Sequence, residues 1–329
     1  MTTALPRWTT STRRRALATA LAAPLLLLAA CGGGGNDALS GDADDDTDTS
    51  GAGGEVVVAY QDYTEMSIMA EMYAALLEAE GFEPTLKGVG DRAIYAGELE
   101  SGAAHVAPEY VSSMTEFLNR ELNGADAEPV ASPDVDETLT QLEELAGQKG
   151  MTPLQPAEAE NANAFAVTKQ FSEENDVTTL SALGELGDPV ALAAAPDCPE
   201  RPDCKRGLES VYDIEISDFQ PLGFGSAQTK DALTGGEVQL GQVGTSDGQI
   251  EQLELVVLED DQDWQNAENL VPVVSTQFLD ENPEVEEILN SLSEVLTTED
   301  LMMLNAQVDS ERLLAADVAR DYLDEKGLI

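Results

Sequence analysis

The chain has 329 residues and a net charge of −48, because 64 Asp and Glu residues stand against 16 Lys and Arg. A charge this negative repels phosphate backbones and excludes nucleic-acid binding through basic patches. The single histidine excludes a metal centre built on two or three histidines. The hydrophobic content of 42% is enough to fill cores, and the length suits two lobes of ordinary size.

Residues 1–30 have the pattern of an export signal. Three consecutive arginines precede an apolar run at 16–30, and no acidic residue occurs before Cys31. The run has 15 residues, fewer than the roughly 20 that a membrane-spanning helix needs. It ends in LAAC, which resembles a bacterial lipobox; a plain signal peptide that happens to contain a cysteine is the alternative. The resemblance implies a lipoprotein signal peptide, lipid attachment to Cys31, and an exported chain anchored to the outer face of a cell membrane.

Residues 31–54 predict a flexible, acidic, Gly-rich tether, because they hold Gly, Ser, Thr and Asp and almost nothing apolar. Their aspartates lack the glycine turn and closing glutamate of a calcium-binding loop. Without residues 1–30 the chain keeps 12 basic and 64 acidic residues, a net charge of about −52. Salt screens such self-repulsion, so the charge indicates either a salt-exposed organism or simply an acidic secreted protein.

From residue 55 onward the sequence alternates between strand and helix patterns. Residues 55–60 carry the β-branched run VVVA, which suits a buried strand. The next amphipathic stretch predicts a helix, in which Asp62 and Glu65 can form a capping box and Gly81 gives the stop. The same scheme predicts a strand near 83–87, a helix near 92–100 and a strand near 105–107. This alternation predicts an α/β lobe with a mostly parallel sheet.

The middle of the chain indicates a second, smaller lobe, where the scheme starts again. Its expected elements are strands at 164–168, 190–194 and 238–243 and helices at 179–186 and 228–233. After residue 248 come apolar strands at 253–258 and 271–275, and then helices alone. Asn282-Pro283-Glu284 is a strong helix start, and further helices are expected at about 298–308 and 310–326.

Three motifs bear on chemistry. Residues 244–248 match the GxSxG pattern of a hydrolase nucleophile, but in α/β-hydrolases the histidine follows the serine, whereas His105 precedes it. The motif therefore favours a glycine-rich crossover between lobes over a tethered exported hydrolase. Cys198 and Cys204 could form half of a zinc site or a disulfide, and an exported context favours the disulfide. His105 lies at the end of a predicted strand, where a ligand contact and a structural role both stay open.

The order of six segments resembles that of the glycine betaine, carnitine and choline substrate-binding proteins of ABC importers, over about residues 55–329. The segments are AYQDYTEMSIMAEMYAALLEAEGF, ELESGAAHVAPEYVSSM, GLESVYDIEI, DALTGGEVQLGQVGTSDGQI, LVVLEDDQDW and LTTEDLMMLNAQVDSERLLAADVARDYLDEKGL. The resemblance implies an α/β, two-lobed periplasmic-binding-protein type II fold with the ligand in the interlobe cleft. Lobe one would hold about residues 55–160 and 249–329, and lobe two about 161–248, with closure about segments near 161–165 and 244–248.

The resemblance also implies a function. The chain would be an extracytoplasmic solute receptor, not an enzyme, that delivers a small molecule to ABC permease and ATPase subunits, with no cofactor and no metal. A trimethylammonium head has no N–H to donate, so aromatic faces hold it by cation–π attraction, and a carboxylate tail needs Arg, a hydroxyl or backbone N–H.

Individual positions are carried over from the family as follows. Tyr110 falls on a cage tyrosine, Phe165 on another cage aromatic and Ser113 on a neighbouring hydroxyl. Arg201 falls on the arginine that binds the carboxylate, and Asn163 stands where an acid is usual.

Departures from the family pattern bear on the choice of solute. Gln61 stands where the family often has a lysine, and Gly244 and Glu268 stand where further aromatics are expected. Four other aromatics could compensate or could simply pack in the core: Tyr60, Tyr63, Tyr95 and Trp264. A different small polar or aromatic solute in the same receptor fold is the alternative, and a tethered structural or adhesive protein is another class to exclude.

Overall fold

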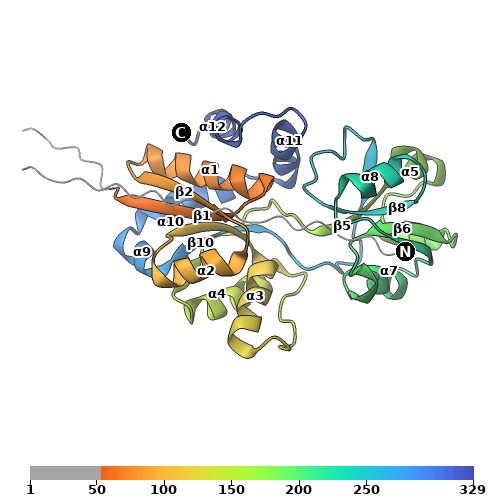
Figure 1. Cartoon of the computed structure of the whole chain (residues 1–329), viewed down its shortest axis with the longest axis horizontal. Helices are drawn as coiled ribbons and strands as arrows, with labels where there is room; N and C mark the ends of the chain where they lie inside the picture. The colour runs from red at the N-terminus through yellow and green to blue at the C-terminus, as the bar shows by residue number, and fades with distance from the viewer. Residues whose placement is uncertain (1–52) are drawn as a thin grey trace, which may run out of the picture. The chain divides into compact units, whose positions relative to one another are not determined.

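The computed structural model describes residues 53–329. The predicted signal peptide, Cys31 and nearly all of the predicted tether lie outside these residues. Across the described part of the chain, none of the helices combines the length and the apolar character that crossing a membrane requires. The described residues build two five-stranded sheets, each with its own helices and core; we call them the first and second lobe (Figure 1).

The first lobe is built on the sheet β2-β1-β3-β10-β4. Strands β1 (Glu55–Gln61), β2 (Glu83–Val89) and β3 (Val106–Tyr110) run parallel, and β10 (Leu270–Ser275) runs antiparallel to both β3 and β4 (Met151–Pro153). β10 is therefore a strand that the chain adds late, after it has built the second lobe. The expected mostly parallel sheet is in fact mixed for this reason.

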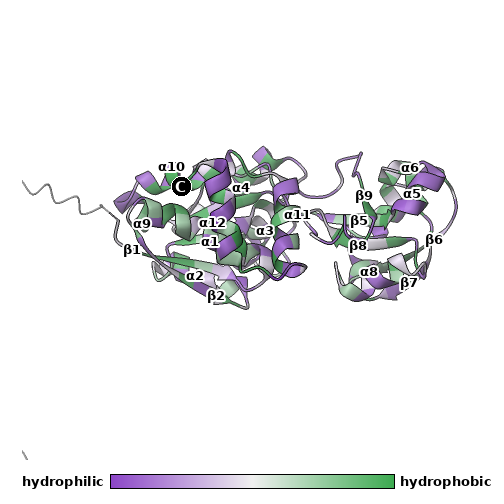
Figure 2. Ribbon diagram, turned by 90° about the horizontal axis from the view of Figure 1, so that it is seen from above, coloured by the Kyte–Doolittle hydropathy of each residue, from purple (hydrophilic) through white to green (hydrophobic). Residues whose placement is uncertain are grey.

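Helix α1 (Thr64–Ala79) lies between this sheet and the C-terminal helices. It contacts β1 and β2 on one side and α10 (Glu284–Ser293), α11 (Thr298–Asp309) and α12 (Ala315–Lys326) on the other. This position explains why α1 is apolar around most of its circumference. The remaining helices of the first lobe are α2 (Arg92–Ser101), α3 (Val111–Asn123), α4 (Val135–Gly147) and α9 (Thr276–Glu281). In Figure 2 hydrophilic and hydrophobic residues alternate along the helices, as expected for helices that bury one face.

The second lobe repeats this strand arrangement in the order β7-β6-β8-β5-β9. Strand β6 (Val190–Ala194) pairs in parallel with β7 (Ile216–Pro221) and β8 (Leu240–Gly244), and β5 (Asn163–Thr168) runs antiparallel to β8 and β9 (Leu255–Leu258). Its helices are α5 (Lys169–Asn175), α6 (Leu180–Glu185), the short 3-10 turn η1 (Cys198–Glu200), α7 (Lys205–Val211) and α8 (Ala227–Thr234).

The boundary between the lobes differs from the expectation. β9 pairs with β5, so residues 255–258, which we expected in the first lobe, belong to the second. The chain therefore crosses between sheets at about 154–162 and 259–269, and residues 244–248 stay in the second lobe. The two crossing segments touch each other, because Glu160 and Asn269 form an antiparallel bridge and Asn161 N donates to Glu268 O at 3.0 Å.

Candidate functional site

Two cavities of about 440 and 290 Å³ share the lining residues Asn161 and Phe224. We call them together the cleft, because their walls come from both lobes. First-lobe residues in the walls are Tyr63, Thr64, Glu65, Asn305 and Asp309; second-lobe residues are Asn163, Arg201, Asp203, Phe224, Gly225, Lys230, Gly244, Ser246, Asp247 and Gly248; the crossing segments add Asn161, Gln265, Asn266 and Glu268. The cleft is thus the place where the two sheets and both crossing segments meet.

Glu65 is the centre of the larger cavity's polar network. Its side chain is buried, and it accepts hydrogen bonds from Tyr110 Oη, from Asn161 Nδ2 at 3.1 Å, from Ser246 Oγ at 2.5 Å and from Asn305 Nδ2 at 2.6 Å. These donors come from the end of β3, the first crossing segment, the loop after β8, and α11. One carboxylate therefore ties the first lobe to the second lobe and to a crossing segment.

The role of Glu65 differs from the sequence expectation. The N-cap of α1 is Tyr63, and no side chain caps the helix there, so the predicted capping box of Asp62 and Glu65 does not form. The Glu65 side chain instead points into the protein, where it accepts hydrogen bonds from the four donors. Nothing local in the sequence marks this change, because the donors lie 45 to 240 residues away along the chain.

Tyr63 and Phe224 place aromatic rings in the cleft. Within residues 53–329 they are the two exposed aromatic side chains, at 39% and 47% exposure, and both line the larger cavity. Tyr63 comes from the start of α1 in the first lobe, whereas Phe224 comes from the loop between β7 and α8 in the second. The Tyr63 hydroxyl donates to Tyr110 Oη at 3.1 Å. Loss of water around its hydroxyl raises the pKa of Tyr63 above its ordinary value of 10.0, at which a tyrosine is already neutral at pH 7.

The backbone of the Phe224 loop is fixed to two strands. Gly223 N donates to Ala194 O at 2.9 Å, at the end of β6, and Gly225 N donates to Gln242 O at 3.0 Å, in the middle of β8. Both glycines have positive φ angles, 108° and 53°, which side chains with a Cβ rarely adopt. A pair of such glycines on either side of an exposed aromatic is the sequence signal that could have found Phe224.

The Phe224 ring lies beside Gly244, the position at which the family pattern predicts an aromatic residue. A Cβ on Gly244 would lie 2.4 Å from Asn161 Oδ1 and 3.4 Å from Phe224 Cζ. The space beside Gly244 is thus already filled by the Phe224 ring and the Asn161 amide. An aromatic face that the family pattern leads us to expect at 244 comes here from a different segment.

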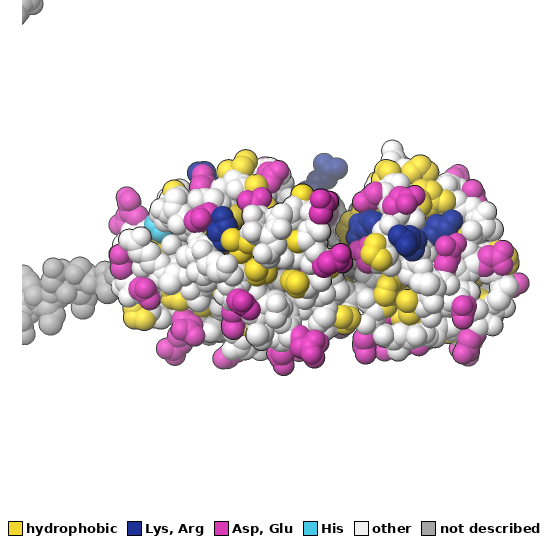
Figure 3. All heavy atoms as spheres, turned by 90° about the horizontal axis from the view of Figure 1, so that it is seen from below, with side chains coloured by type: hydrophobic (Ala, Val, Ile, Leu, Met, Phe, Trp, Pro, Cys, Tyr) yellow, Lys and Arg dark blue, Asp and Glu magenta, His cyan; other side chains and the backbone are white. Residues whose placement is uncertain are grey.

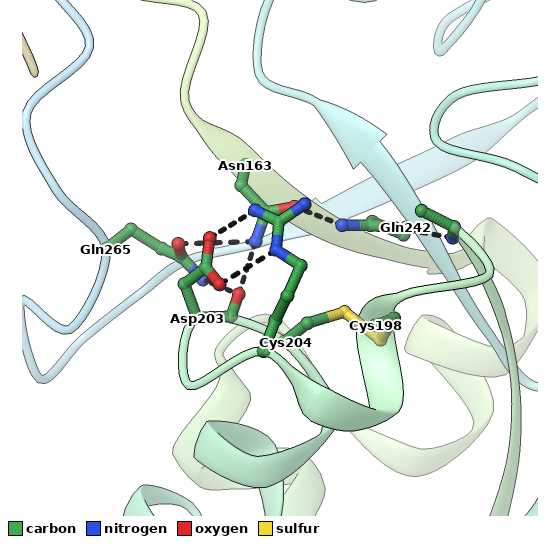
Figure 4. Close-up of a disulfide and its surroundings, with 8 residues drawn as sticks. Asn163, Cys198, Asp203, Cys204, Gln242 and Gln265 are labelled. Atoms are coloured by element: carbon green, nitrogen blue, oxygen red, sulfur yellow. Dashed lines mark hydrogen bonds and ion pairs between the residues drawn. A yellow bond between two sulfur atoms is a disulfide. The ribbon is translucent and has the colours of Figure 1, made fainter. Parts of the chain in front are cut away.

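Arg201 and Asn163 both line the smaller cavity. Asn163 and Asp203 lie near the disulfide between Cys198 and Cys204 (Figure 4). Arg201 forms a two-pronged ion pair with Asp203, in which Nε donates to Oδ1 at 2.9 Å and Nη2 donates to Oδ2. The side chain of Asn163 donates to Asp203 O at 2.6 Å and accepts from Gln242 Nε2 at 2.6 Å. The Asp203 carboxylate raises the pKa of Arg201, and it also occupies one edge of the guanidinium group.

Lys230 is the second cation of the cleft, and it too is paired. Its Nζ donates to Asp247 Oδ1 at 3.0 Å and to Oδ2 at 2.7 Å, and both side chains are nearly buried. On the face shown in Figure 3, acidic side chains are spread over both lobes, whereas several Lys and Arg side chains gather on the second lobe, at the right.

Ser113 binds Glu268 at the start of α3. Its Oγ donates to Glu268 Oε1 at 2.8 Å and its backbone N donates to Oε2 at 3.1 Å. Burial raises the pKa of Glu268 to about 7, although the two bonds from Ser113 and the nearby Arg92 lower it and Glu109 raises it further. Glu268 lines the smaller cavity of the cleft, together with Arg201 and Asp203. Glu268, expected to stand in the place of an aromatic, is therefore a carboxyl group that titrates near neutral pH.

We expect a pH-dependent contribution from Glu268 to stability. Its pKa in the folded protein, about 7, lies above its ordinary value of 4.5, so the folded state holds the proton that the unfolded chain releases. The stabilisation is complete below pH 4.5 and is lost as the pH rises through 7. Relative to Glu268→Gln, the free energy of unfolding of the wild type should fall by about 3 kcal/mol over this window and then level off. Urea unfolding at a series of pH values measures the difference, and a flat difference contradicts the assignment.

The structure places the other expected residues outside the cleft. Phe165 is fully buried in the core of the second lobe, stacked on Trp264 with a centroid distance of 6.2 Å. Tyr110 is buried and reaches the cleft only through its hydroxyl. Gln61, at the end of β1, lines neither cavity of the cleft. Tyr95 is buried against Glu109, and half-buried Tyr60 packs against the core of the first lobe.

His105 and Ser246 have structural roles. His105 Nδ1 accepts from Val57 N at 2.9 Å, and its ring stacks on Phe278 at a centroid distance of 4.5 Å. Ser246, the serine of the GxSxG pattern, donates to Glu65. Within residues 53–329 no group of three or more His, Cys, Asp or Glu side chains is arranged to hold a metal ion.

Residues 54–325 match the family model described as the substrate binding domain of ABC-type glycine betaine transport systems. The chain belongs to this family. It is 27% identical over 275 residues to the glycine betaine-binding protein YehZ of Escherichia coli. The match covers 80% of this chain and 88% of YehZ. It is 26% identical over 279 residues to a glycine-betaine-binding protein of Pseudomonas aeruginosa, with 81% and 86% covered.

The solved structure of apo YehZ from Escherichia coli has the same fold. It superposes with a TM-score of 0.71 at 26% identity, over 84% of this chain and 99% of that one. The protein therefore has the two-lobed type II fold of periplasmic binding proteins, as the sequence predicted, and it is a substrate-binding receptor of the ABC-importer class.

Proposed function

We infer that the protein is an extracytoplasmic receptor that binds a small quaternary ammonium solute, such as glycine betaine, choline or carnitine, in the cleft. The observation that carries this inference is the pair of exposed aromatic rings, Tyr63 and Phe224, which reach one cavity from opposite lobes. Aromatic faces attract a quaternary ammonium head, which has no N–H to donate, by about 2 kcal/mol or more when water is excluded.

The site residues of this proposal differ from those that the family pattern supplied. Tyr63 and Phe224 provide the aromatic faces, and Tyr110 positions Tyr63 through the hydroxyl contact at 3.1 Å. Arg201 and Asn163 line the smaller cavity and face the solute's tail. The solute would thus lie between Asn161 and Phe224, where the two cavities meet.

The route of transport follows from the family and from the N-terminal sequence. We propose that a signal peptide at 1–30 exports the chain and that a lipid on Cys31 anchors it to the outer face of the membrane, where it serves ABC permease and ATPase subunits. The position of LAAC at the end of the apolar run supports this anchor. Residues 31–54 would act as a tether that lets the receptor reach its permease. We expect the solute to be released unchanged.

A thermal-shift screen of the purified protein tests the proposal. A solute that binds only the folded state raises its stability by about 2.7 kcal/mol at a hundredfold excess over Kd. We expect a rise in Tm with at least one of glycine betaine, choline, carnitine and proline betaine, and no conversion of that solute by NMR. Shifts with ectoine or amino acids alone would favour a different solute in the same fold, and chemical conversion would favour an enzyme.

A further inference from the structure

The two cations that line the cleft are already neutralised by carboxylates. Arg201 is paired with Asp203, and Lys230 is paired with Asp247 through both carboxylate oxygens. An anionic group of a solute would therefore meet no cation whose charge is free. The single open edge of the Arg201 guanidinium group lies beside a carboxylate that offsets its charge.

Two further carboxyl groups of the cleft have no cationic partner among the described residues. Glu65 is bonded by neutral donors alone, namely a tyrosine hydroxyl, a serine hydroxyl and two amides. Glu268 is bonded by the hydroxyl and the backbone N–H of Ser113. Exposed Asp309 accepts a hydrogen bond from Thr64 at 2.6 Å and adds a third negative charge. A buried carboxylate without a counter-ion is costly, and a cationic ligand would lower that cost.

We propose that the cleft selects its solute by charge, binding a singly positive quaternary ammonium solute such as choline in preference to a zwitterion with the same headgroup. This inference rests on the proposed function, because it takes the aromatic pair as the headgroup site. The trimethylammonium group lies between Tyr63 and Phe224, and its charge is balanced by Glu65 and Glu268. The carboxylate of glycine betaine would instead add a negative charge beside Asp203 and Glu268.

Titration calorimetry of the purified protein with three solutes of similar shape tests the selection. At a pH of about 8 Glu268 is ionised, since its pKa is about 7. We expect choline to bind about tenfold more tightly than glycine betaine and the neutral isostere 3,3-dimethylbutan-1-ol to bind at least about tenfold more weakly than choline. Equal or tighter binding of glycine betaine overturns the charge selection and leaves the proposed function standing. Binding of neither quaternary amine overturns the charge selection, and it overturns the proposed function as well when carnitine and proline betaine also leave the Tm unchanged.

The variant Glu268→Gln removes one uncompensated charge and should lower the ratio of choline affinity to glycine betaine affinity by about fivefold. Both solutes are titrated into the same preparation, so a fraction of misfolded protein cancels from the ratio. The matched control is Glu78→Gln, an exposed glutamate on α1 that pairs with Arg320. An unchanged ratio in Glu268→Gln, or an equal change in Glu78→Gln, contradicts the assignment.

Discussion

Replacing Phe224 by Leu should weaken the binding of a quaternary ammonium solute by about tenfold. Leucine fills most of the space of the ring and keeps its apolar character, but it has no π face to attract the cation. Phe224→Ala should weaken binding at least as much, whereas Phe224→Trp should keep most of the affinity, since an indole ring is the strongest cation–π partner. Titration calorimetry of the four proteins with one solute measures these differences.

The leucine variant separates two explanations of the same contact. If Phe224 only buries the methyl groups of the solute, Phe224→Leu binds like the wild type and Phe224→Ala alone is weak. That pattern would contradict cation–π binding in the cleft. Leu314→Ala, at an exposed apolar residue that lines neither cavity, serves as the control and should leave the affinity unchanged.

Replacing Glu65 by Ala should lower the free energy of unfolding by about 4 kcal/mol and the Tm by about 8 °C. The substitution leaves Tyr110, Asn161, Ser246 and Asn305 with donors that have lost their acceptor. Glu65→Gln keeps one acceptor oxygen, so its effect should be smaller. Calorimetric or circular-dichroism melting measures both variants.

The control for this prediction lies on the same helix. Glu78→Ala removes an exposed glutamate of α1 whose ion pair with Arg320 is open to solvent, and such pairs contribute little. If Glu65→Ala melts within about 2 °C of Glu78→Ala, the hydrogen bonds to Glu65 do not stabilise the contact between the lobes.

Local patterns in the sequence predicted most elements of the first lobe. The apolar run of β1, the amphipathic face of α1 and the glycine after α2 are all short-range signals, and strand and helix follow them closely. Helices α3 and α4 were not predicted, although both bury one apolar face and Asp134 caps the start of α4, so the sequence did carry a signal for them. β9 was predicted as a strand, but an apolar strand carries no local signal of the sheet that it joins, so it was assigned to the wrong lobe.

The candidate site was only partly predictable. Tyr63 and Arg201 line the cleft as the sequence led us to expect, whereas Phe165 packs in the core. Family position gave Phe165 its expected role, but position in a pattern does not reveal burial. Glu65 was missed because its partners are distant in sequence, and Phe224 because its place beside Gly244 arises only when the loop after β7 folds back onto β8.

A crystal structure of the protein with a bound quaternary amine tests the central claim most directly. We predict that the trimethylammonium group lies within about 6 Å of the ring centroids of both Tyr63 and Phe224, with the solute's tail toward Arg201. A solute found away from both rings, for example in the adjoining cavity of about 440 Å³ that Phe165 and Asp260 line and that shares Asn163 with the smaller cavity, would contradict this account of the site.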